Sequence, residues 1–378
     1  MQVKKALRII HSEAATSFGG QEHRIFKEMV AMRDRGHYLE AICQPDAELT
    51  DKLREAGFVV HTLYMDGLIN IIKGIFQIKR ILRAGNFDVL NTHSRQDTLI
   101  AGAAGRLAKV PLIVRTRHLA SKIGSLLTYT WLPQRISTVS EYVRQQVIAR
   151  GISSDLVETI YTGVVLAPPV ATSSLRSELG LSAEDTIVGC VAVMRPNKGH
   201  HLLLDAIEPI LQSQKDVHLV LVGGGSPLTE ELQARVKAAG LAAQVHFLGT
   251  RKDVPNLLAG FDFFALATQL EALGTVFVEA AASGLAVIGT DVGGVREMMI
   301  PGVTGLLVPP KDTAALRLAI QTLIDHPDVR LRMGQIGSER IWQDGIFTTE
   351  RLGQRTEEIY NKWLSDLGHT ANMSQPAS

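Results

Sequence analysis

Two pairs of charged side chains stand at predicted junctions between strands and helices. Arg195 and Lys198 follow a predicted strand, while Glu271 and Glu279 lie eight residues apart around the predicted start of a helix. A guanidinium and an ammonium group can grip a diphosphate, and carboxylates can accept hydrogen bonds from the hydroxyl groups of a sugar or a ribose. The free N–H groups of a helix start would add to such an anion site. The residues at that start are Leu273, Gly274 and Thr275.

Each pair also has a purely structural interpretation. The two cations would then form a solvated turn, and the two acids would be a surface residue and a helix-dipole residue. Glu279 weakens this second interpretation because it lies among apolar residues, where a carboxylate needs a partner.

Glycines close two further predicted strands. Gly223, Gly224 and Gly225 follow one strand, and Gly293 and Gly294 follow another. Residues without a Cβ let the backbone approach a ligand closely. The alternative is an ordinary tight turn, and the first run does not match the dinucleotide-binding pattern G-x-G-x-x-G.

Two series of alternating strands and helices carry these residues. The alternation predicts an α/β protein with two parallel-sheet, Rossmann-like domains, in which ligands bind beyond the carboxyl ends of the strands. A proline-containing stretch at 165–172 predicts the linker between them. The predicted strands are 6–11, 38–43, 59–63, 89–92, 112–115 and 136–139 in the first series, and 187–193, 218–222, 245–248, 263–266, 286–289 and 305–308 in the second.

Composition narrows the class of protein. A chain of 378 residues with 46% hydrophobic and 20% charged residues predicts a folded protein of two domains. Cys43 and Cys190 are the only cysteines, which excludes a disulfide framework. The sequence shows no signal-peptide pattern and no apolar run near the roughly 20 residues that span a bilayer, so a cytoplasmic protein is expected.

Charge is distributed unevenly along the chain. Residues 1–170 contain 22 Lys and Arg against 15 Asp and Glu, so the first half is basic and the second half is acidic. A basic half can attract anionic lipid or a phosphorylated acceptor, although an ordinary uneven surface is the alternative. No nucleic-acid partner is expected.

In order and spacing, these clusters resemble those of the family 4, group 1 glycosyltransferases of the GT-B fold. The resemblance covers nearly the whole chain, and its most specific part is the E-x7-E motif matched by Glu271 and Glu279. The other matches are 195–199 for R-x-x-K-G, 223–225 for a G-x-G strand end, 247–249, the 293–294 turn and 304–309.

The resemblance implies two Rossmann-like domains that face each other across a cleft. It predicts an acceptor-binding domain at 1–168, a nucleotide-sugar-binding domain at 169–346, a helix at 347–366 that returns to the first domain, and a disordered tail at 367–378.

Five residues of the first half match positions of the family's acceptor domain. Gly19 and Gly20 match a glycine loop near the donor phosphates, and His118 matches a histidine close to the transferred sugar. His93 and Ser140 match a histidine and a serine on the acceptor side. From the residues alone, His118 is more often an ordinary strand-end histidine.

Three segments depart from the family pattern. The chain has Ala272-Leu273-Gly274 where Gly-Phe-Gly is usual, and Thr162-Gly163-Val164-Val165 where Asn-Gly-Val-Asp is usual. Ala267-Thr268-Gln269 replaces the usual Pro-Ser before the E-x7-E motif. The last two departures leave the preferred nucleotide base open.

The resemblance also implies a mechanism. Front-face attack would retain the anomeric configuration, with the leaving phosphate taking the acceptor proton. Arg195, Lys198 and the helix start would stabilise the departing diphosphate. Glu279 would hold the ribose, whereas Glu271 and His118 would orient the donor sugar. The reaction would need no cofactor and no metal ion, and no Asp-x-Asp motif occurs in the chain.

Residues 68–83 predict an amphipathic helix with Lys73, Lys79, Arg80 and Arg83 among apolar residues. The helix could pack on the first sheet, lie on an anionic membrane at the inner face of the cytoplasmic membrane, or do both. A membrane-facing helix suits a lipid-linked acceptor. We therefore expect transfer of a hexose from a UDP- or GDP-sugar to a glycan or lipid-linked acceptor in bacterial cell-surface polysaccharide or lipopolysaccharide synthesis.

Two other functions fit the same architecture. A sugar-nucleotide epimerase would need acid and base residues around the sugar but no acceptor, and the E-x7-E and R-x-x-K-G combination favours transfer over this chemistry. A non-catalytic sugar-nucleotide sensor would be expected to lose Lys198 or Glu271, and the chain retains both.

Overall fold

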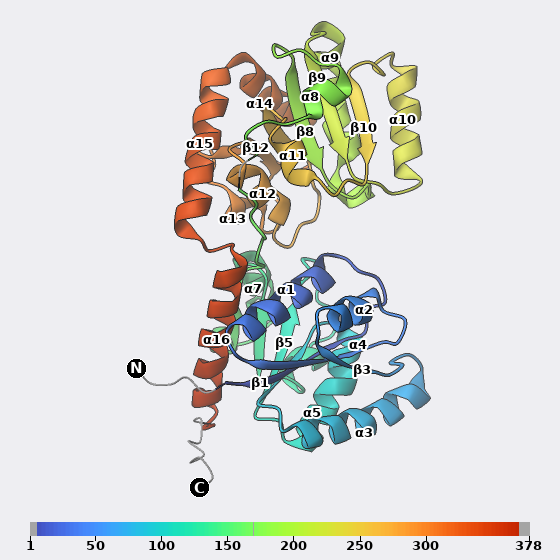
Figure 1. Cartoon of the computed structure of the whole chain (residues 1–378), viewed down its shortest axis with the longest axis vertical. Helices are drawn as coiled ribbons and strands as arrows, with labels where there is room; N and C mark the ends of the chain where they lie inside the picture. Colours follow the sequence, from blue (N-terminus) through green and yellow to red (C-terminus); the bar gives the residue numbers. More distant parts are fainter. Residues whose placement is uncertain (1–5, 169, 370–378) are drawn as a thin grey trace. The chain divides into compact units, whose positions relative to one another are not determined.

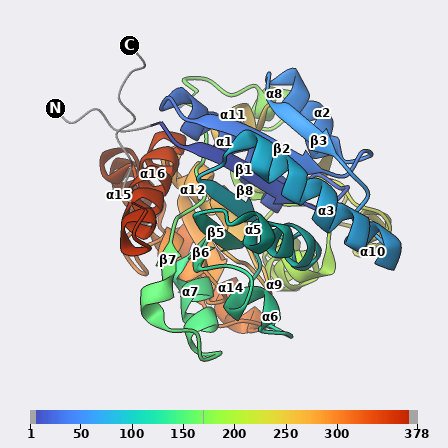
Figure 2. The same cartoon turned by 90° about the horizontal axis from the view of Figure 1, so that it is seen from below.

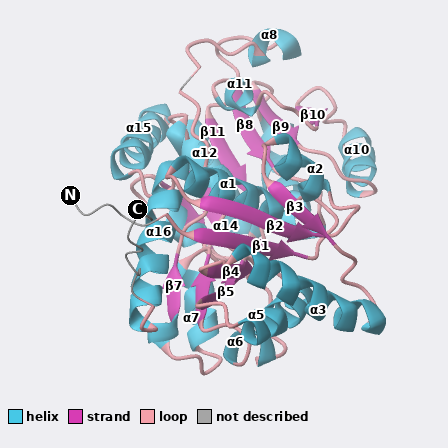
Figure 3. Cartoon of the chain, turned by 60° about the horizontal axis from the view of Figure 1, so that its bottom comes forward, coloured by secondary structure: helices cyan, strands magenta, loops and turns pink. Residues whose placement is uncertain are grey.

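The computed structural model describes residues 6–168 and 170–369 of the chain (Figure 1). The chain divides into two compact units: unit 1 contains Met1–Gly163 and Phe347–Ser378, and unit 2 contains Val164–Ile346. Each unit is a parallel sheet covered by helices, which confirms the predicted α/β class (Figure 3). Residue 169 of the predicted linker and residues 370–378 of the predicted tail lie outside the described residues.

Unit 1 contains a seven-stranded parallel sheet in the order β3-β2-β1-β4-β5-β6-β7. Its strands are β1 (Arg8–Glu13), β2 (Tyr38–Cys43), β3 (Val59–Thr62), β4 (Val89–Thr92), β5 (Leu112–Arg117), β6 (Arg135–Thr138) and β7 (Val157–Thr159). Its helices are α1 (Gly20–Asp34), α2 (Glu48–Glu55), α3 (Leu68–Gly85), α4 (Arg95–Asp97), α5 (Ala103–Ala108), α6 (Leu127–Thr130), α7 (Glu141–Ile148) and α16 (Thr349–Asp366). A π-helical segment η1 (Thr98–Gly102) joins α4 to α5, and a 3-10 turn η2 (Ser154–Leu156) precedes β7.

Unit 2 contains a six-stranded parallel sheet in the order β10-β9-β8-β11-β12-β13. Its strands are β8 (Thr186–Val191), β9 (Val217–Val222), β10 (Val245–Gly249), β11 (Phe263–Leu266), β12 (Ala286–Thr290) and β13 (Gly305–Val308). Its helices are α8 (Leu175–Leu179), α9 (His200–Ser213), α10 (Leu228–Ala238), α11 (Val254–Leu258), α12 (Thr275–Ala282), α13 (Val295–Met298), α14 (Thr313–Asp325) and α15 (Pro327–Asp344), with the turn η3 (Pro196–Lys198).

Alternate strand residues of unit 1 point to opposite faces of its sheet. Ile9 and Val89 belong to a core that includes residues of α1, α2 and α16. Their chain neighbours Ile10 and Leu90 belong to a second core with α3 and α5. Burial on both faces explains why these strands are apolar throughout rather than alternating.

Helix α16 packs against α1, so the predicted return of the last helix to the first domain is confirmed (Figure 1). Arg35, directly after α1, forms an ion pair with Glu357 of α16. The hydroxyl of Tyr360 is buried and accepts a hydrogen bond from Asn91 Nδ2 at 2.8 Å. These contacts connect the end of the chain to the middle of the first sheet.

Two strands extend two residues beyond their predicted carboxyl ends. β1 continues past His11 through Ser12 and Glu13, and β5 continues past Arg115 through Thr116 and Arg117, although polar residues suggested earlier ends. All four added residues are buried. The three-residue edge strand β7 was not predicted, because its sequence Val-Glu-Thr forms no apolar run.

Helix α3 has a packing side and an exposed apolar stripe. Ile78 and Leu82 are buried against the first sheet, as one of the two interpretations of residues 68–83 required. Ile69, Ile72 and Phe76 are 69%, 54% and 63% exposed at helical spacing. Figures 1 and 2 show α3 and α5 side by side on the outside of unit 1. Within the described residues, no helix is long and apolar enough to cross a bilayer.

Candidate active site

The predicted charged groups of unit 2 follow two adjacent strands. The strand order reverses between β8 and β11, and open α/β sheets bind ligands at the carboxyl ends of strands at such a reversal. Arg195 and Lys198 follow β8, whereas Glu271 follows β11. The topology therefore brings the two groups to the same edge of the sheet.

Lys198 and Glu271 form an ion pair at this edge. Nζ of Lys198 donates to Oε2 of Glu271 at 2.5 Å, and the side chains are 23% and 16% exposed. The same two loops are joined by hydrogen bonds to the carbonyl oxygen of Asn197, from Gln269 N at 2.7 Å and from Thr268 Oγ1 at 3.1 Å. A bound anion would thus compete with Glu271 for an ammonium group that the loops hold in place.

Arg195 is the second cation and is exposed. It precedes the turn η3, and its carbonyl oxygen accepts a hydrogen bond from Lys198 N at 2.9 Å. No hydrogen bond or ion pair of its side chain occurs among the described residues. The guanidinium is therefore available to an anion that arrives from solvent.

Two glycines fix the loop that carries Glu271. Gly293 has φ +57°, and a Cβ on it would lie 1.6 Å from the carbonyl oxygen of Glu271. The same oxygen accepts a hydrogen bond from Gly294 N at 3.2 Å. Gly199 has φ +70°, and its Cβ would lie 1.8 Å from the carbonyl oxygen of Ala267. A side chain at Gly293 or Gly199 would force these loops apart.

The glycines after β9 also allow two loops of unit 2 to approach each other closely. A Cβ on Gly223 would lie 2.0 Å from the carbonyl oxygen of Ala192, and one on Gly225 would lie 2.4 Å from that of Met194. Met194 N also donates to Gly224 O at 3.0 Å. In the structure, these glycines therefore allow close approach of the loop after β8, which carries Arg195 and Lys198.

Helix α12 begins just beyond Glu271. Gly274 precedes it with φ +90°, a conformation that favours glycine. The N–H groups of Thr275 and Val276 find no acceptor within residues 6–168 and 170–369, as is usual at a helix start. Glu279 is half-buried in the second turn. Glu271 thus lies between its partner Lys198 and the positive end of α12.

The strand order in the sheet of unit 1 also reverses, between β1 and β4. Gly19 and Gly20 lie in the exposed segment after β1, where α1 begins. Gly19 N donates to Oε2 of Glu22 at 2.7 Å. The predicted glycine loop is thus at the carboxyl edge of the first sheet.

Three histidines of unit 1 form a hydrogen-bonded chain. His11 Nδ1 lies 2.9 Å from His93 Nε2, and His93 Nδ1 lies 3.0 Å from His118 Nε2. They come from β1 and from the ends of β4 and β5, and all three are buried. Burial lowers the pKa of His11 to about 4 and holds the pKa values of His93 and His118 well below the usual value. The three rings are therefore neutral at pH 7.

The structure separates Ser140 from this chain. Ser140 is buried and follows β6, where its Oγ accepts a hydrogen bond from Val143 N at 3.2 Å and caps α7. His93 has both ring nitrogens engaged by other histidines. Direct contact with an acceptor would require each of these residues to give up a buried partner.

Two family models match the chain in succession. The model described as Glycosyltransferase Family 4 matches residues 18–167, and the model described as Glycosyl transferases group 1 matches residues 172–340. A GDP-mannose-dependent alpha-(1-6)-phosphatidylinositol monomannoside mannosyltransferase of Mycolicibacterium smegmatis is 30% identical over 70% of this chain and 76% of its own. The chain belongs to the family 4, group 1 glycosyltransferases.

Two further matches agree with this assignment. A phosphatidyl-myo-inositol mannosyltransferase of Mycobacterium leprae is 27% identical over 85% of this glycosyltransferase and 88% of its own chain. The crystal structure of Anabaena Alr3699/HepE in complex with UDP covers 94% of the chain and all of its own with a TM-score of 0.83 at 22% identity. The structural match confirms the GT-B fold.

Three buried polar residues beside the candidate residues of this glycosyltransferase were missed from sequence. In unit 1, His11 continues the histidine chain; in unit 2, His200 is buried at the start of α9 directly after Gly199. Burial raises the pKa of Glu13 to about 8 at the end of β1. A signal was present for two of them, because His11 directly follows the apolar run Ile9–Ile10 and His200 directly follows Gly199 of the R-x-x-K-G segment.

Proposed function

We propose that this family 4 glycosyltransferase moves a hexose from a UDP- or GDP-sugar to a glycan or lipid-linked acceptor with retention of anomeric configuration. The observation that carries the proposal is the Lys198–Glu271 ion pair at the reversal of the second sheet. The same loops carry Arg195, whose side chain has no partner in the part of the chain that the structure describes, and the open start of α12. A departing nucleoside diphosphate has the charge that these three groups are arranged to meet.

The proposed roles follow from this arrangement. Lys198 leaves Glu271 and binds the diphosphate together with Arg195, and Glu271 then accepts hydrogen bonds from hydroxyl groups of the donor sugar. Glu279 holds the ribose. His118 of unit 1 orients the donor sugar, as the family resemblance implies. Neither a metal ion nor a cofactor takes part.

The relatives support the class of substrate. The M. smegmatis protein is named as GDP-mannose-dependent and as acting on a phosphatidylinositol mannoside. A lipid-linked acceptor in bacterial cell-surface polysaccharide or lipopolysaccharide synthesis is therefore proposed, at the inner face of the cytoplasmic membrane.

The proposal is tested with a panel of UDP- and GDP-sugars. We expect slow release of nucleoside diphosphate, faster release with acceptor, undiminished activity in the presence of a chelator, and a product whose new bond has the donor's anomeric configuration by NMR. A rearranged sugar on an intact nucleotide would identify an epimerase, whereas binding without release would identify a sensor. Complete loss of activity with the chelator would contradict metal independence.

The exposed stripe of α3 is proposed to contact an anionic membrane surface. Residues 67–87 contain four Lys or Arg and no Asp or Glu. Ile69, Ile72 and Phe76 lie along the same side as Lys73 and Arg80. Apolar side chains beside cations on an amphipathic helix are suited to the boundary between headgroups and acyl chains.

Serine at positions 69, 72 and 76 is expected to abolish flotation of the protein with phosphatidylglycerol-containing vesicles. Stability should change little, because these side chains are already exposed. Leu318→Ser is the matched control, since Leu318 is also 69% exposed but lies on α14 of unit 2. Equal flotation of the triple variant and the control variant would rule out this membrane contact.

A further inference from the structure

We infer that His93 and His11 hold His118 in the tautomer that carries its proton on Nδ1, so that His118 offers a hydrogen-bond donor to a ligand oxygen. His93 and His11 are thus positioning residues. The inference rests on the proposed function only for the identity of that oxygen, which would belong to the donor sugar or its phosphate.

The chain of hydrogen bonds permits only two arrangements of protons. A neutral imidazole has one N–H donor and one lone-pair acceptor. His93 contacts a ring nitrogen of His11 at 2.9 Å and one of His118 at 3.0 Å, so it must donate to one and accept from the other. Either all three rings carry the proton on Nδ1, or all three carry it on Nε2.

The surroundings of His11, at the buried end of the three hydrogen-bonded histidines, decide between the two arrangements. His11 Nε2 is enclosed and has no hydrogen-bond partner among the described residues. Protonation on Nε2 would leave a buried N–H without an acceptor, whereas protonation on Nδ1 leaves only an unused lone pair there. A buried N–H without an acceptor is rarer in proteins than a buried lone pair without a donor, and it costs more free energy.

The charges near His11 are consistent with this choice. Arg24 of α1 is 1% exposed, and its guanidinium can only donate hydrogen bonds. The nearby carboxylate of Glu28 forms an ion pair with this cation, with Oε2 at 3.2 Å from Arg24 Nη2, and its Oε1 accepts from the Tyr360 hydroxyl at 3.2 Å. All three guanidinium nitrogens of Arg24, and Glu28 Oε2, have no hydrogen-bond partner among the described residues. Unused donors thus outnumber unused acceptors near His11, and a lone pair on its Nε2 suits this neighbourhood better than another N–H would.

The position of the proton on His118, at the other end of the hydrogen-bonded chain of histidines, determines how this residue can interact with a ligand. With its Nε2 accepting from His93, His118 carries its proton on Nδ1. No atom among the described residues accepts a hydrogen bond from His118 Nδ1. His118 therefore acts toward a ligand as a donor and cannot take up an acceptor proton at that nitrogen. This agrees with a mechanism in which the leaving phosphate is the base.

The test is a ring-nitrogen NMR correlation on full-length protein labelled with ¹⁵N-histidine, with His118 assigned through His118→Asn. At pH 7 we expect the Nδ1–H pattern for His118, His93 and His11. In His93→Leu the His118 pattern should change, and in His93→Asn, which keeps an amide donor, it should be retained. The exposed His201 should be unchanged in every variant.

The NMR measurement can contradict the inference about His118 independently of the result of the transferase assay. An Nε2–H pattern for His118 in the unmodified protein would overturn the inference, whether or not the protein transfers sugar. The pattern is measured on the unmodified protein, and only the assignment of the His118 signals uses a variant. An Nδ1–H pattern that persists in His93→Leu would show that His93 does not set the tautomer. Absence of transferase activity together with the expected NMR pattern would overturn only the proposed function.

Discussion

Lys198→Ala is expected to lower kcat by about 100-fold or more while leaving the protein folded. Negative charge grows on the diphosphate as the sugar departs, and loss of one preorganised charged donor typically costs a factor of this order. Lys198 is partly exposed in its ion pair with Glu271, so its removal should change the free energy of unfolding by only about 1 kcal/mol. Steady-state kinetics and chemical denaturation measure the two effects.

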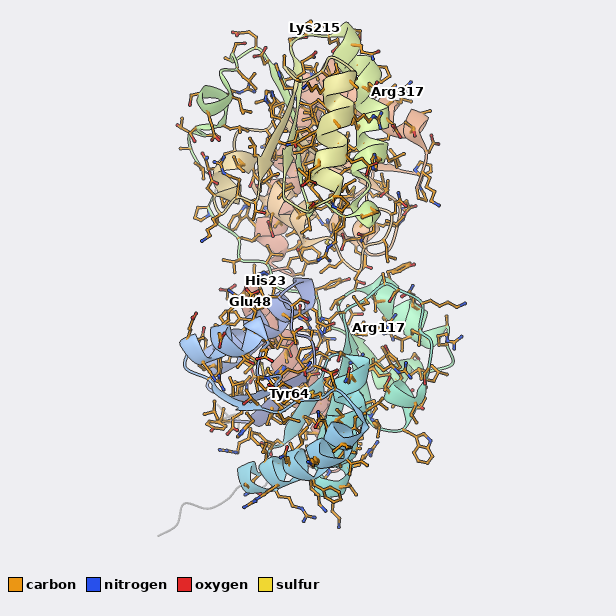
Figure 4. All side chains as sticks on the ribbon, turned by 90° about the vertical axis from the view of Figure 1, so that its right-hand side faces the viewer. His23, Glu48, Tyr64, Arg117, Lys215 and Arg317 are labelled. Atoms are coloured by element: carbon orange, nitrogen blue, oxygen red, sulfur yellow. The ribbon has the colours of Figure 1, made fainter. Side chains whose placement is uncertain are left out.

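Lys215→Ala is the matched control for that variant. Lys215, labelled in Figure 4, is an exposed lysine of the same unit, but it precedes β9 and so stands at the amino ends of the strands. Its removal should leave kcat unchanged. Turnover of Lys198→Ala close to that of Lys215→Ala would contradict the assignment of Lys198 to the leaving group.

Gly293→Ala is expected to weaken donor binding by on the order of 100-fold, because its Cβ would lie 1.6 Å from the carbonyl oxygen of Glu271. Real Cβ atoms essentially never approach other heavy atoms within 3.0 Å. The loop that carries Glu271 must therefore move by roughly 1 Å or more, a displacement large enough to disable a preorganised site. Titration with the intact UDP- or GDP-sugar, which carries the hydroxyl groups assigned to Glu271, measures the loss.

Gly302→Ala separates this clash from backbone strain. Gly302 lies in the same unit with φ +76°, yet its Cβ would meet no atom within 4 Å. Both variants place alanine in a left-handed conformation, which costs roughly 1–2 kcal/mol of stability. Only Gly293→Ala should also lose donor affinity. Equal affinity of the two variants would mean that the position of the Glu271 loop does not govern binding.

The sheets could be predicted from sequence because their strands are apolar runs buried on both faces. Strands β2, β4, β11 and β13 have the predicted bounds. The errors concentrate where strands enter the site. In β1, the predicted strand ended at His11, yet the polar residues Ser12 and Glu13 are buried and keep the strand conformation. Local hydrophobicity does not encode this burial.

The location of the site could be predicted in part, because the apolar strands show where each sheet ends. Charged and glycine residues after strands indicated where an anion would bind, and the structure brings Lys198 and Glu271 into contact there. The pairing itself joins residues 73 positions apart, which no local pattern specifies. The chain from His11 to His118 likewise depends on the order of β1, β4 and β5 in the sheet.

The most direct test is a crystal structure of the protein with UDP or GDP. We expect β-phosphate oxygens within about 3 Å of Lys198 Nζ and of an N–H group at the start of α12, with Glu271 separated from Lys198. A nucleotide whose phosphates lie elsewhere, with the Lys198–Glu271 ion pair intact, would contradict the account.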